Sequence, residues 1–230
     1  MRIMTTPAAA DEDRALILHE DKFLLIANKP AGLLSVPTPN AAGKTLLDRL
    51  RGLGLGPLAV HRLDRETSGV MLFARDPETR AALEELFRLR KVEKTYWALI
   101  NGRLRAGSGR YDFPIFEQGG VARVAVKGQP AETRWRVLAA HSSTTEVEVD
   151  LKTGRYNQIR LHFSHAGHPL VGERKYARGK ESALPLRSRR VALHAWRLAF
   201  AHPRSGKRLQ VEAPLPADLE DLRARAGGGG

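Results

Sequence analysis

The chain has 230 residues, 42% of them hydrophobic, which is enough to bury one large core or the cores of two subdomains. Its 38 Lys and Arg against 25 Asp and Glu give a formal net charge of +13. Such a charge attracts polyanions, without distinguishing RNA from DNA, heparin or an anionic membrane. Because the chain has no Cys, disulfides, thiol nucleophiles and thiolate metal sites are excluded, which fits a reducing compartment.

The two ends of the chain predict flexible segments around one folded region. Residues 1–14 are small, polar and charged, without the apolar stretch of a secretory signal, and residues 227–230 are four Gly. No apolar run approaches the roughly 18 residues that a membrane span requires. We therefore expect a cytoplasmic protein that does not enter a membrane, folded from residue 15 to residue 226.

The first half of the chain predicts short strands and well-capped helices. Residues 23–27 are an apolar run of strand length, followed by a turn at 28–32. Thr45 can cap a helix with Asp48 as its reciprocal partner. Asp76 followed by Pro77 is a typical start for a second helix. The buried face of the first helix would comprise Leu46, Leu47 and Leu50, and that of the second Leu83, Leu86 and Phe87.

The second half is richer in strands. Residues 95–100 alternate with period two, which places Tyr96, Ala98 and Ile100 on one face and Trp97 and Leu99 on the other. Further elements are expected as a hairpin over 113–126, a strand at 146–151 with an acidic outer face, a helix at 157–166, strands at 191–200 and 209–211, and a helix at 216–226. This pattern favours an α+β fold with a mixed, largely antiparallel sheet flanked by helices and loops.

The most informative stretch runs from His61 to Asp76. At its centre Asp64 lies between Arg62 and Arg65, in a loop that leads into the apolar run 70–74. An acid on a loop that a buried strand holds is a common arrangement for a catalytic group. Taken alone, however, such an Asp is more often a surface ion pair or a turn former. A metal site at His61 and Asp64 is disfavoured because no third or fourth ligand recurs nearby.

Three ordered blocks resemble one family. His-Arg-Leu-Asp-x-x-Thr-Ser-Gly-Val-Met-Leu-Phe-Ala at 61–74 is similar to the signature of the RluA family of pseudouridine synthases. Lys-Thr-Tyr-Trp-Ala at 94–98 and Gly-Arg-Tyr-Asn-Gln-Ile-Arg-Leu-His at 154–162, followed by Gly-His-Pro-Leu-Val-Gly-Glu at 167–173, agree in order and spacing. His61 favours the RluA branch, since the related RsuA branch carries Gly there. The resemblance covers residues 16–215.

The resemblance implies an enzyme that converts uridine in RNA to pseudouridine, with Asp64 as its catalytic residue. The reaction is redox-neutral and needs no group donor, so we expect no cofactor and no metal. The carboxylate could attack the sugar or the base, or remove a ribose proton. Arg160 would lie opposite Asp64 and pair with it, and Tyr96 would stack on the extruded base. Without the resemblance, Arg160 would be interpreted as a surface helix residue and Tyr96 as a core residue.

Other residues are implied as RNA contacts. Arg62 matches a position near the stack that a flipped base leaves empty, although an ion pair to Glu66 or a phosphate contact is the alternative. Ile159 matches a position against the target base, with core burial equally plausible. The chain departs from the family at 156–157, where it has Tyr-Asn instead of a residue followed by His; Gln158 and Arg160 are in place. The expected RNA-binding set is Arg62, Ile159, Gln158, His61, Arg187, Arg189 and Arg190.

The last three of these belong to a basic stretch. Between residues 173 and 208 there are eleven Lys or Arg and two acidic residues, and part of this charge is expected to contact phosphates. No S4-like RNA-binding module is visible, so the partner is expected to be a tRNA or rRNA stem-loop bound by a monomer. A non-catalytic RNA-binding protein or chaperone of the same fold is one alternative. A generic basic DNA-binding protein is another, although no helix-turn-helix or zinc-finger pattern supports it.

Overall fold

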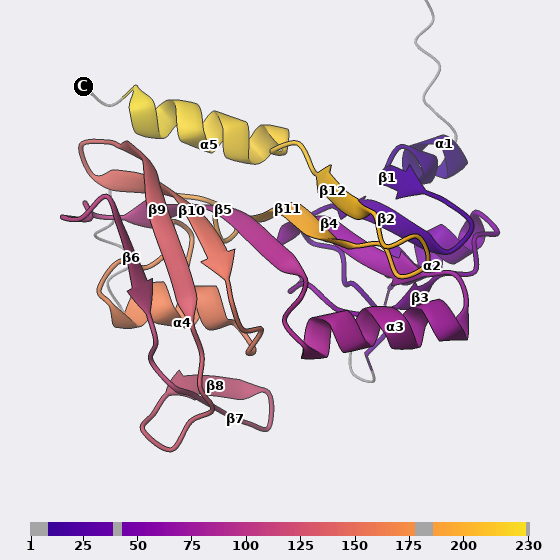
Figure 1. Ribbon diagram of the computed structural model, residues 1–230. Coiled ribbons are helices and arrows are strands. Elements are labelled where there is room, and N and C mark those ends of the chain that lie inside the picture. The colour runs from indigo at the N-terminus through magenta and orange to yellow at the C-terminus, as the bar shows by residue number, and fades with distance from the viewer. Residues whose placement is uncertain (1–8, 39–42, 178–185, 229–230) are drawn as a thin grey trace, which may run out of the picture. The chain divides into compact units, whose positions relative to one another are not determined.

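A computed structural model describes residues 9–38, 43–177 and 186–228, which form helices α1–α5 and strands β1–β12 (Figure 1). The chain divides into two compact units. Unit 1 contains the chain up to Val92 together with Ala199–Ala213, and unit 2 contains Glu93–Leu198 together with the chain from Pro214 onward. The single folded region expected for residues 15–226 is therefore organised as two subdomains.

Unit 1 is built on an antiparallel sheet whose inner strands are apolar. β2 (Leu24–Lys29) pairs with β1 (Ile17–Glu20) on one side and with β4 (Ser68–Ala74) on the other. β3 (Leu58–Ala59) also pairs with β4. Every residue of β4 is buried, as expected for a strand covered on both faces. The Asp64 loop leads directly into Ser68, the first residue of β4, so the end of the loop is attached to a rigid strand.

The helices of unit 1 begin where the caps predict. α2 (Leu46–Gly52) starts at Thr45, which forms a reciprocal capping box with Asp48, and its three Leu are buried. α3 (Pro77–Arg88) starts at Asp76, whose carboxylate accepts from the backbone N–H of Thr79 at 2.7 Å. Only Leu83 of the expected α3 stripe is fully buried; Leu86 and Phe87 are half-buried.

Residues 9–14 correct the expectation of a flexible N-terminus. They form helix α1 (Ala9–Arg14), with Asp11 and Glu12 in the first turn and Arg14 in the last, as the helix dipole favours. Arg49 of α2 forms an ion pair with Asp13, and Arg14 pairs with Glu20 at 3.0 Å. The expected flexibility of residues 1–8 lies outside the described residues.

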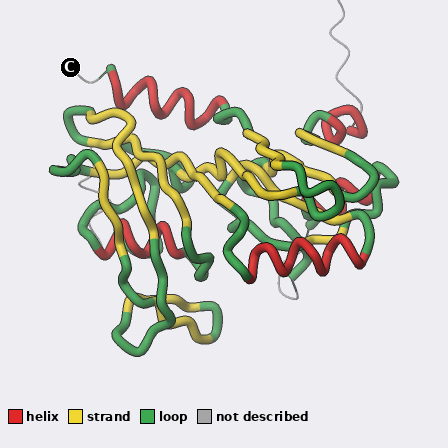
Figure 2. The backbone as a smooth tube through the Cα atoms, viewed as in Figure 1, coloured by secondary structure: helices red, strands yellow, loops and turns green. Residues whose placement is uncertain are grey.

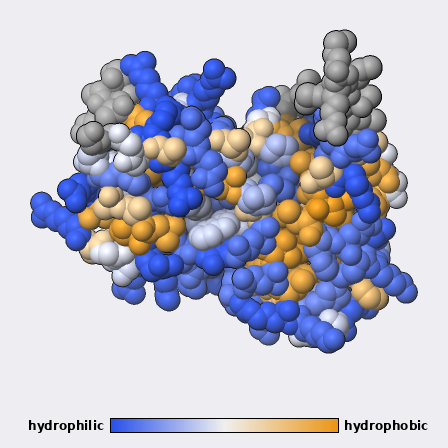
Figure 3. Space-filling model, turned by 90° about the horizontal axis from the view of Figure 1, so that it is seen from above, coloured by the Kyte–Doolittle hydropathy of each residue, from blue (hydrophilic) through white to orange (hydrophobic). Residues whose placement is uncertain are grey.

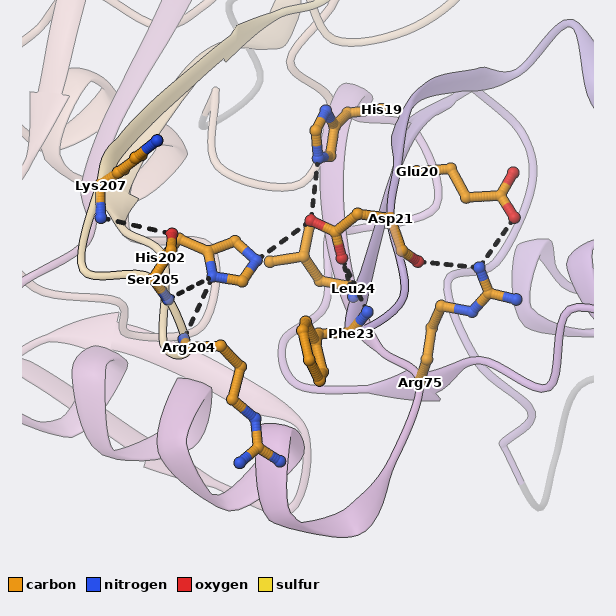
Figure 4. Close-up of polar contacts among 10 residues, drawn as sticks. All are labelled: His19, Glu20, Asp21, Phe23, Leu24, Arg75, His202, Arg204, Ser205 and Lys207. Carbon is orange, nitrogen blue, oxygen red and sulfur yellow. Dashed lines mark hydrogen bonds and ion pairs between the residues drawn. The ribbon is translucent and has the colours of Figure 1, made fainter.

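A polar cluster ties the turn before β12 (Arg208–Glu212) to the turn between β1 and β2 (Figure 4). The Nδ1 of His202 accepts from the backbone N–H groups of Arg204 and Ser205, so its Nε2 carries the proton. That Nε2–H donates to Asp21 Oδ2 at 3.0 Å, and His19 contacts the same oxygen at 3.3 Å. Burial acts to raise the pKa of Asp21, but these bonds and two backbone N–H groups lower it below 3.8.

Unit 2 contains a further set of antiparallel strands. These strands belong to the same ten-stranded sheet as β1, β2 and β4, and their order in unit 2 is β5 (Glu93–Asn101), β10 (Thr144–Leu151), β9 (Thr133–Ala140) and β6 (Ser108–Tyr111), with β11 (Leu193–Ala201) beside β5. β11 passes from unit 2 into unit 1 at Ala199. The described registers are all antiparallel, which agrees with the expected α+β fold.

The sheet of unit 2 is covered on both faces (Figures 1 and 2). Tyr96, Ala98 and Ile100 face a core shared with α4 (Gln158–His165), whereas Trp97 and Leu99 face one shared with α5 (Ala217–Gly227). This confirms the predicted alternation. Because α5 covers the second face, Glu146 is buried beneath it instead of facing solvent, and it accepts from the Trp97 Nε1–H at 2.7 Å. The expected acidic outer face is therefore wrong at Glu146.

A hairpin and a helix end complete the fold. β7 (Ile115–Gln118) and β8 (Val121–Val124) pair across Gly119 and Gly120, whose φ of 59° and 75° are the positive values that a two-residue hairpin turn requires. Gly227 ends α5 and so is not part of a flexible tail; residues 229–230 lie outside the described residues. On the face drawn in Figure 3, hydrophilic residues predominate and hydrophobic residues form separate patches.

Candidate active site

The backbone on either side of Asp64 is held by hydrogen bonds within unit 1. The Ser35 hydroxyl donates to the carbonyl oxygen of Leu63 at 2.7 Å and accepts from the backbone N–H of the same residue at 3.0 Å. On the other side, the backbone N–H of Thr67 donates to the Asp64 carbonyl at 3.1 Å and closes a turn. These bonds fix both peptide groups next to Asp64, so the loop has one defined path into β4.

Lys29 anchors the next residue of the loop. Its side chain is 0% exposed, and its Nζ donates to the carbonyl oxygens of Pro30 (2.9 Å), Leu33 (2.7 Å) and Arg65 (3.2 Å). The Gly32 N–H also donates to the Arg65 carbonyl, and Arg65 Nε donates back to the Gly32 carbonyl. From the residues alone 28–32 was predicted as a turn, and the family resemblance implied that it lies near the site; the anchoring role of a Lys at the end of a largely apolar strand was missed.

His61 and Arg62 have different environments. The Nε2 of His61 accepts from the backbone N–H of Leu72 at 2.9 Å, and its ring lies 4.9 Å from that of Phe87 in α3. These contacts attach the start of the loop to β4 and α3, so the described role of His61 is structural and an RNA contact stays a prediction. Arg62 is exposed, which is compatible with its expected role toward RNA.

Arg160 is held in unit 2 by a carboxylate that sequence reasoning missed. Its Nε and Nη2 donate to the two carboxylate oxygens of Glu173, at 2.6 and 2.8 Å. The Glu173 side chain is 0% exposed, and it also accepts the backbone N–H groups of Lys175 and Tyr176. The expected pairing of Arg160 with Asp64 stays a prediction, because Asp64 belongs to unit 1. The signal for Glu173 was an acid directly after the apolar stretch 169–172.

The start of α4 explains two further residues. Gln158 is 2% exposed; its carbonyl oxygen accepts from the Thr153 hydroxyl and the Arg155 N–H, and its amide donates to Glu132 O and Thr133 Oγ1. These four bonds use the full capacity of the amide. The described role of Gln158 is therefore to hold α4 against β9, and its RNA contact stays a prediction.

Ile159 and Tyr96 share one face of the unit 2 sheet. Ile159 is buried in the core between α4 and the sheet. This agrees with core burial, one of the two roles that the sequence left open for it. Tyr96 is partly buried and packs against the same core. The structure thus brings Tyr96 and the helix that carries Arg160 to the same side of the sheet.

The basic stretch is not uniformly available to phosphates. Arg187 and Arg189 are exposed, as expected of RNA contacts. Arg190 is 8% exposed, and its Nε and Nη2 donate to the carboxylate of Asp218 at 2.6 and 3.0 Å. Arg190 is therefore less available than Arg187 and Arg189, and its RNA contact stays a prediction. Arg178 and Lys180 lie outside the described residues.

A comparison with known families identifies the family of the chain. The model of the RNA pseudouridylate synthase family matches residues 23–165. The chain belongs to this family. The matched region contains the Asp64 loop, β5 with Tyr96, and the block at 154–162 that carries Arg160. Membership makes the chain an enzyme of the pseudouridine synthase class, with RNA as its kind of substrate.

The curated relatives agree with the RluA branch. The chain is 35% identical over 217 residues to an uncharacterized RNA pseudouridine synthase of Bacillus subtilis, covering 90% of the chain and 70% of the relative. It is 39% identical over 221 residues to the ribosomal large subunit pseudouridine synthase D of Nitrosomonas europaea, covering 90% and 63%. It is 36% identical over 213 residues to the ribosomal large subunit pseudouridine synthase C of Vibrio cholerae, covering 89% of the chain and 67% of the relative. The chain thus spans about two thirds of the length of these relatives.

Solved structures show the same fold. Human RNA pseudouridylate synthase domain containing 4 superposes with a TM-score of 0.79 at 27% identity, covering 95% of this chain and 96% of that chain. Human RNA pseudouridylate synthase domain containing 1 superposes with a TM-score of 0.74 at 25% identity, covering 90% of this chain and 86% of that chain. The expected pseudouridine synthase fold is therefore confirmed.

The described part of this pseudouridine synthase chain shows neither a metal-ligand group nor a membrane-spanning helix. Within residues 9–38, 43–177 and 186–228, no group of three or more His, Asp or Glu is placed to hold a metal ion. Among the helices of the described part, none is long and apolar enough to cross a membrane.

Proposed function

We propose that the protein isomerises specific uridines of structured ribosomal or transfer RNA to pseudouridine, with Asp64 as the catalytic carboxylate acting on a flipped-out base. The observation that carries the proposal is the construction of the Asp64 loop. Buried Lys29 and Ser35 fix the backbone on both sides of one acid, within the region that matches the family. Two curated relatives are named for ribosomal large subunit RNA, which favours ribosomal RNA.

The chemistry requires one ionised and well-aimed carboxylate. Isomerisation breaks the C1′–N1 bond, turns the base and joins C1′ to C5, and the C5 proton is lost to solvent. Asp64 can attack C1′ or the base, or it can take a ribose proton, and each route uses its negative charge. An Asp with an ordinary pKa near ~3.9 is ionised at neutral pH, provided that burial by RNA does not isolate its charge.

Arg160 is proposed as the cation that accompanies Asp64 when RNA closes over it. A guanidinium has five N–H donors, so one Arg can serve two carboxylates at once. The fork on Glu173 holds Nε and Nη2, and it fixes the plane of the guanidinium to within hydrogen-bond tolerance. Glu173 is then a positioning residue that acts through Arg160. Without it, the long Arg side chain would have several rotamers to choose from.

Tyr96 and Arg62 are proposed to handle the base. The Tyr96 ring projects from β5 on the face that also carries α4, where it can stack on an extruded uracil. Because a uridine in a folded RNA must leave its stack before C1′ is reached, a side chain that occupies the empty position lowers the cost of flipping. Arg62 is exposed next to Asp64 in the chain, and it is our candidate for this role.

The competing function is RNA binding without catalysis, and a single comparison separates the two. Pseudouridines would be mapped in total RNA from cells with the gene, without it, and with the gene carrying Asp64→Asn. We expect one or a few sites in ribosomal or transfer RNA to disappear on deletion, to return with the wild-type gene, and to stay absent with Asp64→Asn. Sites that return with Asp64→Asn would refute its catalytic role, and an unchanged map would refute the proposed function.

A further inference from the structure

Two tyrosines and a lysine form a mixed aromatic and basic surface in unit 2. Lys175 Nζ lies 5.1 Å from the ring centroid of Tyr156 and 5.4 Å from that of Tyr176. Both rings are partly exposed, and Lys175 is exposed. We define the aromatic–basic patch as these three residues together with Arg155, the neighbour of Tyr156 in the chain.

The patch is rigidly supported. Tyr156 and Tyr176 pack against a small hydrophobic core formed by the β7–β8 hairpin, the following loop and α4, which comprises Ile115, Ala122, Ala131 and Leu161. The Tyr176 hydroxyl accepts from Asn157 Nδ2 at 2.8 Å, and its backbone N–H donates to the buried Glu173. The rings are therefore held in place before any ligand arrives, which reduces the entropy lost on binding.

The charge of the patch is not neutralised by neighbouring acids. Within the described residues, neither Arg155 nor Lys175 forms an ion pair, and the Arg155 side chain donates to the Pro130 carbonyl.

A second basic surface of unit 2 provides the contrast. On β6 and β9, Arg110, Arg134 and Arg136 are all exposed, and each has an acidic neighbour: Asp112 at 3.9 Å, Glu132 at 2.6 Å and Glu148 at 3.1 Å. We call this the paired face. Its cations already have carboxylates beside them, so their attraction for a polyanion is largely cancelled.

We propose that the aromatic–basic patch binds unpaired nucleotides of the RNA substrate other than the target uridine. Its cations would contact phosphates, and the faces of Tyr156 and Tyr176 would stack on one or two bases. This combination of basic side chains with aromatic platforms suits single-stranded RNA, because paired bases do not offer a free face. The proposal rests on the proposed function for its choice of RNA as the partner. It assigns the loop of the RNA, not its stem, to this surface.

The first test compares two variants that remove the same number of charges. One variant carries Arg155→Gln and Lys175→Gln, and the matched control carries Arg134→Gln and Arg136→Gln. Binding to a fluorescent oligouridylate would be measured from 50 to 200 mM salt. We expect the patch variant to lower the slope of log K against log salt by about 1.4, since each phosphate contact on a single strand contributes about 0.7. The control should keep the wild-type slope. An equal fall of the salt slope in both variants would mean that only the net charge of the protein matters, and it would refute the proposed role of the patch.

The second test isolates stacking. Tyr156→Leu and Tyr176→Leu keep apolar packing against the hairpin core but remove the ring, whereas the matched Tyr→Phe variants keep it. Stacking lost from one base should weaken binding to oligouridylate by about 5- to 150-fold at an unchanged salt slope, while the Phe variants bind as the wild type. A fully paired RNA duplex should bind all four variants alike. Normal oligouridylate binding by both Leu variants would overturn the stacking role, and circular dichroism would confirm that each variant is folded.

Turnover of the same preparations separates this proposal from the proposed function. If the wild-type chain binds oligouridylate through the patch but isomerises no uridine in ribosomal or transfer RNA, the binding surface stands and the activity fails. If it isomerises uridine while the patch variant keeps the wild-type salt slope, the activity stands and the patch fails.

Discussion

The Asp64 loop in unit 1 and the Arg160 helix in unit 2 hold their functional side chains in different ways. In the loop, the described anchors Lys29, Ser35 and Gly32 all act on backbone groups of the residues around Asp64. In the helix, Glu173 acts on the guanidinium itself and carries the opposite charge. Losing a loop anchor should therefore disturb geometry, whereas losing Glu173 should disturb both geometry and charge.

The largest effect is expected at Arg160. Arg160→Met removes the guanidinium and leaves the buried Glu173 carboxylate without it, which should cost about 3–5 kcal/mol of unfolding free energy. The single-turnover rate should fall on the order of 100-fold or more, because the charge aimed at the site is lost. The remaining activity should shift to higher pH, since losing a nearby cation raises the pKa of a carboxyl group. RNA affinity should change far less. Arg160→Lys should fall between, because it keeps the charge without the planar fork.

The double variant Arg160→Met/Glu173→Gln sharpens this prediction. Because no carboxylate is then left isolated, much of the lost stability should return, as judged by urea unfolding, while the rate stays as low as in Arg160→Met. If Glu173→Gln slowed the reaction just as much in the Arg160→Met background as in the wild type, Glu173 would not act through Arg160. Normal turnover by Arg160→Met with much weaker RNA binding would instead identify Arg160 as a phosphate contact.

Lys29 is the corresponding test in unit 1. Lys29→Met keeps the aliphatic stem but removes a buried donor from the carbonyls of Pro30, Leu33 and Arg65, of which Arg65 keeps the Gly32 N–H. We expect a loss of about 3 kcal/mol or more in unfolding free energy, and a fall in the chemical step with RNA affinity nearly unchanged. If Lys29 acts through these three carbonyls, the pH–rate profile should keep its midpoint. A shifted midpoint would show that Lys29 acts electrostatically on Asp64.

Ser35 should give a smaller effect of the same kind. Ser35→Ala removes both hydrogen bonds to the Leu63 peptide groups, so it should cost about 1–3 kcal/mol and lower the single-turnover rate without changing its pH dependence. Ser108→Ala, at an exposed position of β6, is the matched control and should change neither the unfolding free energy nor the single-turnover rate. Wild-type activity and stability in Ser35→Ala would show that the loop does not depend on this anchor.

The smallest effect concerns acid sensitivity, which we assign to His162 in α4. Burial lowers the pKa of His162 below 6.5, helped by nearby His165 and opposed by the Phe113 carbonyl and Asp112. The folded state therefore binds the proton less readily than the unfolded state, so the stability is complete above pH 6.5 and is lost as the pH falls below it. The loss should approach about 1.4 kcal/mol per pH unit. His162→Phe should flatten this dependence between pH 7.5 and 5.5; an unchanged slope would place the acid-sensitive group elsewhere.

The elements that sequence reasoning predicted well depend on local rules. The capping box of Thr45 and Asp48, the Asp76–Pro77 helix start, and the alternation of β5 all involve residues within four positions of one another. Their energetics are local, so tertiary context did not override them.

The errors depend on residues that are far apart in the sequence. Glu146 is buried because α5 returns over β10 some 70 residues later, as its ion pair with Arg223 shows. Two interactions that sequence reasoning did not foresee are of the same kind: Asp218 pairs with Arg190, and Glu132 and Thr133 bind Gln158. Glu173 was overlooked for the same reason. The acid after the apolar stretch 169–172 was visible in the sequence, but its partner Arg160 lies 13 residues away and no local rule connects the two.

The most direct test of the central claim follows the C5 hydrogen of the target uridine. RNA containing [5-³H]uridine would be mixed with excess wild-type or Asp64→Asn protein, and tritium release and RNA affinity would be measured on the same samples. We predict release from the wild type and none detectable from Asp64→Asn, with affinities that agree within about tenfold, or 1.4 kcal/mol. Tritium release by Asp64→Asn at a substantial fraction of the wild-type rate would contradict the assignment of Asp64 as the catalytic carboxylate.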